Sequence, residues 1–148
     1  MTSHEPSTQK SDEAPPEEPA EEVVREMFAR LSARDFDGVV DLLADDVEFD
    51  LAYAPAGYEM PVRGRDAMRN LVTGVIGAMF NPFRIDIVTV YPGLDPGVLV
   101  AEYKSEATVT HNQKQYLNRY VGIFKLDGGL ITFWREYHNP EEATRALS

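Results

Sequence analysis

The stretch that decides the fold is VLVAEYKSEATVTHNQKQYLNRYVGIFKLDGGLITFWREYH, residues 98–138. Three runs in it are rich in β-branched and aromatic residues, which predicts long strands over 98–110, 116–126 and 130–138. The polar segment HNQKQ separates the first two runs, and the DGG between the last two is a typical hairpin signal. This part of the chain is therefore predicted to be an antiparallel sheet.

The residues before this stretch follow helical and extended patterns in turn. Apolar residues recurring every three to four positions predict amphipathic helices over 21–32, 35–43 and 66–79. Alternating apolar and polar residues predict strands over 47–51 and 83–91, with a loop over 52–62. Helices first and hairpins last is the α+β pattern. A curved sheet over a helical layer leaves an apolar cavity between the two, where pockets preferentially form.

The overall composition excludes several classes of function. The chain has 148 residues, 14 Lys+Arg against 25 Asp+Glu, a net charge of −11 and no cysteine. A protein without cysteine has no disulfide framework, no thiol nucleophile and no zinc ribbon. The negative charge argues against nucleic acid and anionic membranes as partners. The polar N-terminus does not resemble a signal peptide, so a cytoplasmic protein is expected.

The acidity is concentrated at the N-terminus. Residues 1–22 hold seven acids, one base and four of the ten prolines. Such a segment buries too little apolar surface to offset the entropy of ordering it. We therefore predict a disordered acidic, proline-rich tail over 1–20 and one folded domain over 21–148.

Four motifs, in this order, carry a resemblance to a known family. They are LLADDVEF at 42–49, VRGRDAM at 62–68, YLNRY at 116–120 followed by DGGLI, and WREYHNP at 134–140. Together they resemble the nuclear transport factor 2-like superfamily, and the last resembles its SnoaL-like branch, which includes the phenazine-biosynthesis A/B proteins. That superfamily contains ketosteroid isomerase, limonene-epoxide hydrolase, polyketide cyclases and non-enzymatic binding domains.

The resemblance covers about 21–147 and implies several properties. It implies a cone-shaped, curved mixed or antiparallel sheet packed on three N-terminal helices, with a deep apolar pocket. It also implies no cofactor and a homodimer formed largely through the sheet. The fold alone does not identify the reaction, because this architecture carries many functions.

Glu136 is the first candidate for catalysis. Alternation on the last strand places it on one face with Trp134 and His138. The resemblance to the phenazine A/B proteins implies that this glutamate lies in the pocket, where an apolar environment raises the pKa of a carboxyl and makes it an acid near neutrality. The alternative is a surface glutamate paired with Arg135 or Arg119.

Asp50 is the second candidate, near the end of the first predicted strand. The resemblance places it close to the general base of ketosteroid isomerase; the alternative is a solvated aspartate at a strand end. Asp50 and Glu136 could form a pair with divided roles, one a base and one a protonated donor. The positions nearest to the isomerase's protonated carboxyl are Val121 and Gly122, which argues against steroid isomerase chemistry.

Polar and aromatic residues complete the predicted pocket. Asn118 and Tyr120 share a strand face with Tyr116 and could bind a carbonyl or enolate oxygen, or else pack in the core or in a dimer interface. Trp134 is expected to form pocket wall or lid together with Tyr53, Tyr58, Tyr103 and Phe80. For Tyr103 and Phe80 plain core packing is an equal alternative.

His138 is a third catalytic candidate because it follows Glu136 on the same face. His111 lies in a polar turn and is expected at the surface. Two histidines on separate elements do not form a metal site, so no metal is expected. The sequence contains no Walker pattern and no G-x-S-x-G elbow, which disfavours nucleotide chemistry and serine hydrolysis.

Two hypotheses of function remain from the sequence. The first is a cofactor-free enzyme of secondary metabolism that isomerises, cyclises, condenses or dehydrates a small apolar or aromatic carbonyl compound. The second is a non-catalytic module that binds a hydrophobic ligand or supports a partner enzyme. A carboxylate that faces the cavity would favour the enzyme.

Overall fold

The structure is a computed structural model that describes residues 19–148. The predicted tail over 1–20 lies outside these residues, except for its last two. The elements in chain order are α2 (Ala20–Ser32), α3 (Phe36–Asp41), β1 (Leu43–Leu51), β2 (Val62–Arg63), α4 (Arg65–Leu71), the π-helix η1 (Val72–Gly77), β3 (Phe80–Pro92), β4 (Val98–Val109), β5 (Gln115–Asp127), β6 (Leu130–His138) and α5 (Pro140–Leu147).

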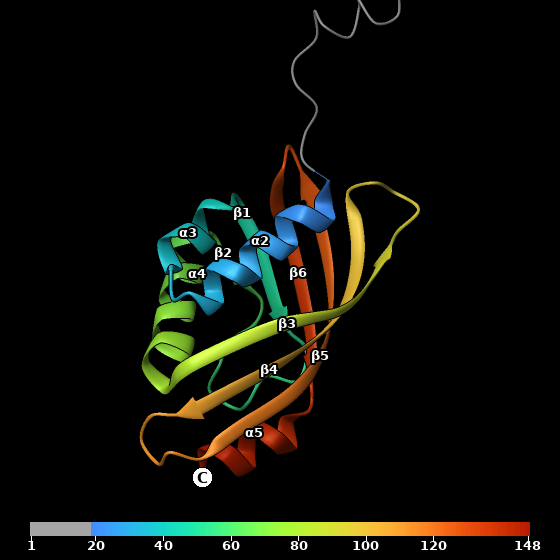
Figure 1. The fold of residues 1–148 in the computed structure, drawn as a ribbon. Coiled ribbons are helices and arrows are strands. Elements are labelled where there is room, and N and C mark those ends of the chain that lie inside the picture. The colour runs from blue at the N-terminus through green and yellow to red at the C-terminus, as the bar shows by residue number, and fades with distance from the viewer. Residues whose placement is uncertain (1–18) are drawn as a thin grey trace, which may run out of the picture.

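The six strands found in residues 19–148 form one curved sheet in the order β2-β1-β6-β5-β4-β3. β1 and β6 run parallel, and every other neighbouring pair runs antiparallel. Figure 1 shows α2, α3 and α4 gathered on one side of the sheet, with α5 at the other end of the long strands. The predicted α+β fold with a mixed sheet packed on N-terminal helices is confirmed.

Helix α2 covers the middle of the sheet through one apolar face. Its buried residues are Val23, Val24, Met27, Phe28 and Leu31. The Phe28 ring lies 4.6 Å from the ring of Tyr103 and 5.8 Å from that of Trp134, measured between centroids. Burial of apolar and aromatic surface between these two layers is the main stabilising contribution to the fold.

The long strands alternate between buried and exposed residues, which fixes their register. On β5 the buried positions are Tyr116, Asn118, Tyr120, Gly122 and Phe124. A slip of one residue would turn this whole set away from the helices. The register therefore places Gly122 between Ala101 of β4 and Glu136 of β6.

The second helix is shorter than the sequence predicts. It ends at Asp41, and Asp45 and Asp46 are exposed residues within β1 instead of a helix end. The backbone N–H of Ile131 donates to the Leu42 carbonyl at 2.9 Å, and Leu43 pairs with Ile131. Pairing with a distant strand therefore overrides the local helical pattern here.

Two further differences concern the segment between β1 and β3. The predicted loop over 52–62 ends in the short strand β2, which pairs with β1. The third helix continues beyond α4 as the π-helix η1. At Gly77 of η1 an added Cβ would lie 3.2 Å from the Phe36 ring, so this glycine lets α3 approach closely. Within residues 19–148, no helix has the length and apolar character needed to cross a bilayer.

Candidate active site

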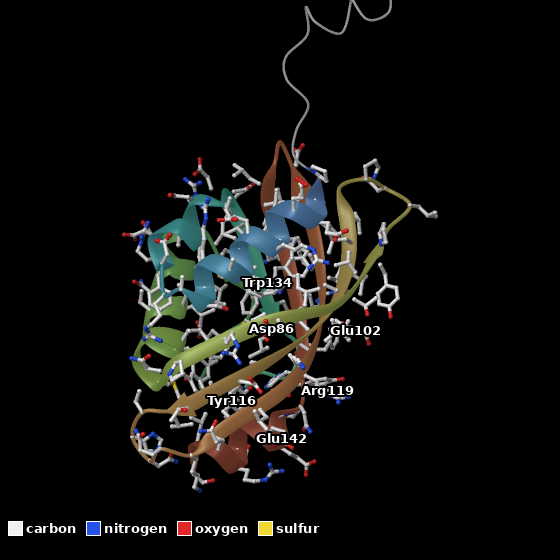
Figure 2. The ribbon with its side chains drawn as sticks, in the orientation of Figure 1. Asp86, Glu102, Tyr116, Arg119, Trp134 and Glu142 are labelled. Carbon is white, nitrogen blue, oxygen red and sulfur yellow. The ribbon has the colours of Figure 1, made fainter. Side chains whose placement is uncertain are left out.

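A cavity of about 180 Å³ lies between the sheet and the elements α4, η1 and α5. Most of its lining is aliphatic or aromatic, contributed by residues such as Phe49, Met68 and Val72. The lining residues that carry a polar side-chain atom, leaving methionine aside, are Tyr58, Tyr116, Tyr120, Trp134, Glu136 and His138. Figure 2 shows Trp134 near α2 and Tyr116 nearer the α5 end of the sheet. Among the described lining residues, Glu136 is the one carboxyl group.

Glu136 reaches the cavity because of its position on β6. It pairs with Leu51 of β1 on one side and with Gly122 of β5 on the other. Its side chain is buried, and the Tyr103 hydroxyl donates a hydrogen bond to its Oε2 at 2.7 Å. The Trp134 indole Nε1–H in turn donates to the Tyr103 hydroxyl oxygen at 3.2 Å. The carboxyl is thus held by a fixed donor whose own orientation is fixed by Trp134.

This environment changes the acidity of the group. Burial raises the pKa of Glu136 from 4.5 to about 7, and the hydrogen bond from Tyr103 opposes part of that rise. Burial, together with the negative charge of Glu136, raises the pKa of Tyr103 well above its usual value. Tyr103 therefore keeps its proton and remains a donor at neutral pH. Glu136 exchanges a proton near neutrality, which general acid–base catalysis requires.

The contact between Tyr103 and Glu136 depends on the missing side chain of Gly122. A Cβ at residue 122 would lie 2.6 Å from the Tyr103 hydroxyl oxygen and 2.8 Å from a ring carbon of Phe124. These distances are shorter than van der Waals contact. The glycine therefore provides the space through which the phenol of β4 reaches a carboxyl two strands away.

His138 lies on the same face, two residues beyond Glu136, and also lines the cavity. Its ring is nearly parallel to that of Tyr120, with an interplanar angle of 14° and centroids 6.4 Å apart. Partial burial lowers the pKa of His138, so the imidazole is neutral at physiological pH. Its Nδ1 is buried, and within residues 19–148 no hydrogen-bond partner for it is found.

A second cluster of hydrogen-bonded polar side chains lies on the sheet beside this site. The Tyr120 hydroxyl lies 2.7 Å from the Ser105 Oγ and 3.1 Å from the Tyr116 hydroxyl. The Asn118 side-chain amide donates to the Tyr116 hydroxyl at 2.8 Å and to the Asn139 carbonyl at 3.0 Å. The rings of Tyr103 and Tyr120 stack with centroids 5.1 Å apart, which joins this group to the Glu136 site.

Comparison with known proteins identifies the family. The family model of the SnoaL-like domain matches residues 24–134, about three quarters of the chain. The chain belongs to the SnoaL-like domain family. The matched segment ends at Trp134, two residues before Glu136, so the family assignment does not rest on the candidate catalytic group.

Individual relatives of this SnoaL-like chain are distant in sequence. The uncharacterized protein YesE of Bacillus subtilis (strain 168) is 24% identical over 117 residues, which cover 79% of each chain. A solved Bacillus subtilis structure, assigned provisionally as an isomerase, has a TM-score of 0.78 at 23% identity and covers 86% of this chain and 91% of that one. An epoxide hydrolase from Mycobacterium tuberculosis, resembling limonene-epoxide hydrolase, has a TM-score of 0.66 at 24% identity, with the same coverage. Such similarity shows the fold alone.

The structure places some candidate residues of this SnoaL-like domain outside the cavity. Asp50 points to the opposite face of β1, where its carboxylate accepts a hydrogen bond from the Arg135 Nε at 2.9 Å. Asp50 and Glu136 therefore do not share a site, and the predicted pair with divided roles is wrong. The surface alternative for Glu136, an ion pair with Arg135 or Arg119, is wrong as well, because Glu136 is buried against Tyr103.

Three aromatic or amide predictions also change. The Asn118 amide is buried and bonded to Tyr116 and Asn139, so it supports the tyrosines and does not itself face a ligand. Tyr53 is 56% exposed and packs against Tyr137, outside the cavity lining. Tyr103 lies behind Glu136 as its hydrogen-bond donor and is not a wall residue. Tyr58, Tyr120, Trp134, His138 and Phe80 do line the cavity.

Sequence reasoning missed the roles of Ser105, Tyr116 and Gly122. Ser105 of β4 pairs with Asn118 of β5. A serine among the mainly apolar inward-facing residues of β4 could have predicted a buried polar contact there. The role of Gly122 depends on three strands meeting in register and has no local signal. Within residues 19–148, no group of three or more metal-ligating side chains comes together.

Proposed function

We propose that the protein is an acid–base enzyme that needs no cofactor and acts on a small, largely apolar carbonyl compound. The observation that carries this proposal is the position of Glu136, the one carboxyl among the described lining residues, with a pKa of about 7 inside an apolar cavity. A carboxyl of this kind both accepts and returns a proton at neutral pH. Isomerisation, cyclisation, condensation and dehydration all begin with such a transfer.

In the proposed reaction the Glu136 carboxylate removes a proton from the carbon next to the carbonyl group. The two electrons of that C–H bond form a C=C bond, and the π electrons of the carbonyl group move onto its oxygen, which gives an enolate. The Glu136 carboxylic acid then returns the proton to another carbon, or to a leaving hydroxyl group. The hydrogen bond from Tyr103 holds the carboxyl in one orientation throughout, which lowers the cost of positioning. The provisional assignment of the similar Bacillus subtilis structure as an isomerase supports this class of reaction.

The ring opening of 5-nitrobenzisoxazole tests the proposal without knowledge of the natural substrate. A base removes the C3 proton of this probe, the N–O bond breaks, and a coloured cyanonitrophenolate forms. The wild-type protein is expected to accelerate this reaction, with a rate that rises with pH around a midpoint of about 7. Glu136→Gln is expected to lower the rate at least tenfold, because glutamine cannot accept the proton. Absorbance at a series of pH values gives both quantities.

The matched control is Asp50→Asn, which removes a carboxylate that faces away from the cavity. Its rate should stay within a factor of about two of the wild type. Equal rates for the wild type and Glu136→Gln would contradict the proposed function. Saturable binding of the probe by a wild-type protein that does not accelerate the reaction would favour the binding module.

We further propose that two copies associate through the outer face of the sheet. This face carries Leu117 and Val121 on β5, a central strand of the sheet, with 54% and 37% of their surface exposed. Exposed aliphatic side chains at the centre of a polar face are typical of an interface. Leu117→Glu is expected to convert a dimer to a monomer in sedimentation velocity, whereas Val88→Glu on the edge strand β3 should not. A monomeric wild type, or a dimer retained in Leu117→Glu, would contradict this arrangement.

A further inference from the structure

Three buried hydroxyl groups form a row beside the cavity. The row runs from the Ser105 Oγ to the Tyr120 hydroxyl at 2.7 Å and on to the Tyr116 hydroxyl at 3.1 Å. Asn118 closes the Tyr116 end, because its amide nitrogen donates to the Tyr116 oxygen at 2.8 Å. Of the three hydroxyl-bearing residues, Tyr116 and Tyr120 line the cavity, and Ser105 lies behind them.

The number of hydrogens in this row exceeds the number of contacts that use them. Each hydroxyl carries one hydrogen, and burial raises the pKa of both tyrosines, so both phenols stay protonated. The two oxygen–oxygen contacts use two of the three hydrogens. Asn118 takes none, because its Oδ1 accepts from the backbone N–H groups of Arg119 and Asn139. Among residues 19–148, no other acceptor is bonded to these hydroxyls, so one hydrogen remains spare.

The spare hydrogen can lie on the cavity side of the row. If Ser105 donates to Tyr120 and Tyr120 donates to Tyr116, the hydrogen of Tyr116 is free. If Ser105 and Tyr116 both donate to Tyr120, the hydrogen of Tyr120 is free. Each of these arrangements leaves a donor on a cavity-lining phenol, and rotation about the C–O bonds interconverts them. A buried donor without an acceptor is costly, which favours an acceptor atom supplied by a ligand.

We propose that the spare hydroxyl hydrogen of the Ser105–Tyr120–Tyr116 row binds the carbonyl oxygen of the substrate. The substrate is then an apolar ketone, aldehyde or ester, with its oxygen at the tyrosines and its reacting carbon toward Glu136. The stacking of Tyr120 on Tyr103, the donor to Glu136, places the two subsites side by side. The same hydrogen bond would stabilise the enolate oxygen, so this inference rests on the proposed function and specifies its substrate class.

A pair of ligands of equal shape tests the acceptor subsite. Acetophenone carries a carbonyl oxygen where α-methylstyrene carries a CH₂ group, and neither needs to react. Tyr116→Phe/Tyr120→Phe is expected to weaken the binding of acetophenone about threefold to tenfold, the effect of one lost hydrogen bond. The affinity for α-methylstyrene should be unchanged, because the apolar walls remain. Ligand-observed NMR titration measures both affinities.

Ser105→Ala is the matched control within the same row. It removes the one hydroxyl outside the cavity lining, and the spare hydrogen must then lie on Tyr116 or Tyr120. Ser105→Ala is therefore expected to bind acetophenone as tightly as the wild type or more tightly. Acetophenone affinity that is unaffected in the double phenylalanine variant, or lost equally with that for α-methylstyrene, would overturn the inference.

Two further measurements keep the test independent of folding and of catalysis. The carbonyl stretch of bound ¹³C-acetophenone should lie at lower wavenumber than in hexane in both the wild type and Ser105→Ala. An unshifted band would overturn the inference even if the double variant failed to fold. Glu136→Gln should keep its preference for acetophenone while it loses proton transfer to the probe, so failure of the subsite and failure of the proposed function give different results.

Discussion

Glu136→Gln is expected to stabilise the protein by about 3 kcal/mol at pH 8.5 and to leave its stability at pH 4 almost unchanged. The carboxyl has a pKa of about 7 in the folded protein and an ordinary value of 4.5. Between these two values the folded state binds more protons than the unfolded state, so wild-type stability falls as the pH rises. Each unit of pKa difference corresponds to roughly 1.4 kcal/mol. Glutamine is neutral throughout and still accepts the hydrogen bond from Tyr103.

Urea denaturation of both proteins at pH 4, 6 and 8.5 measures this effect. The difference between their free energies of unfolding should grow from pH 4 to pH 7 and then level off. Asp50→Asn controls for the change in net charge, because it also removes one carboxylate. Asp50 lies on the outer face, where it pairs with Arg135. A difference that is constant over the whole range would contradict the raised pKa, and with it the role of Glu136 at neutral pH.

The loss of stability caused by ionised Glu136 follows from the same raised pKa that lets this group transfer protons at neutral pH. An ionised carboxylate in an apolar cavity is unfavourable unless several donors surround it, and among residues 19–148 Glu136 has one donor, Tyr103. A second donor would stabilise the carboxylate and return the pKa toward 4.5, which would weaken the group as a base at pH 7. The single hydrogen bond therefore orients Glu136 without removing its reactivity.

The face on which a residue lies was predictable from the sequence where a strand alternates regularly. The pattern of β6 places Trp134, Glu136 and His138 together, and all three line the cavity. The alternation of Phe49 and Leu51 in β1 likewise places Asp50 on the other face, as the structure shows. The resemblance to ketosteroid isomerase instead predicted a catalytic position for Asp50 in the pocket. The local periodicity predicted its face correctly.

The contacts that tune the site were not predictable in the same way. Tyr103 meets Glu136 across an intervening strand, and this contact exists because residue 122 has no side chain. The sequence could place each residue on a face, but the register between β4, β5 and β6 decides which residues meet. The hydrogen bond from Asn118 to Asn139 was not predictable either, because Asn139 lies beyond the end of β6 and outside its alternating pattern.

Gly122→Ala is expected to lower the free energy of unfolding by about 1 to 3 kcal/mol, the usual cost of overpacking a filled core. The added methyl group would lie 2.6 Å from the Tyr103 hydroxyl oxygen and 2.8 Å from the Phe124 ring, so both side chains must move. Movement of Tyr103 removes the hydrogen bond that opposes the rise in the pKa of Glu136. The pH midpoint of the 5-nitrobenzisoxazole reaction should therefore shift above 7.

Tyr103→Phe separates the two effects of that substitution. By itself it removes the donor to Glu136 and should shift the pH midpoint upward with little overpacking. Combined with Gly122→Ala it removes the atom at the shortest contact, so the double variant should regain part of the stability lost in Gly122→Ala while keeping the shifted midpoint. A Gly122→Ala protein as stable as the wild type, with its midpoint still at about 7, would contradict the idea that Gly122 makes room for Tyr103. Stability from urea denaturation and the pH profile of the probe reaction decide between these outcomes in the same four proteins.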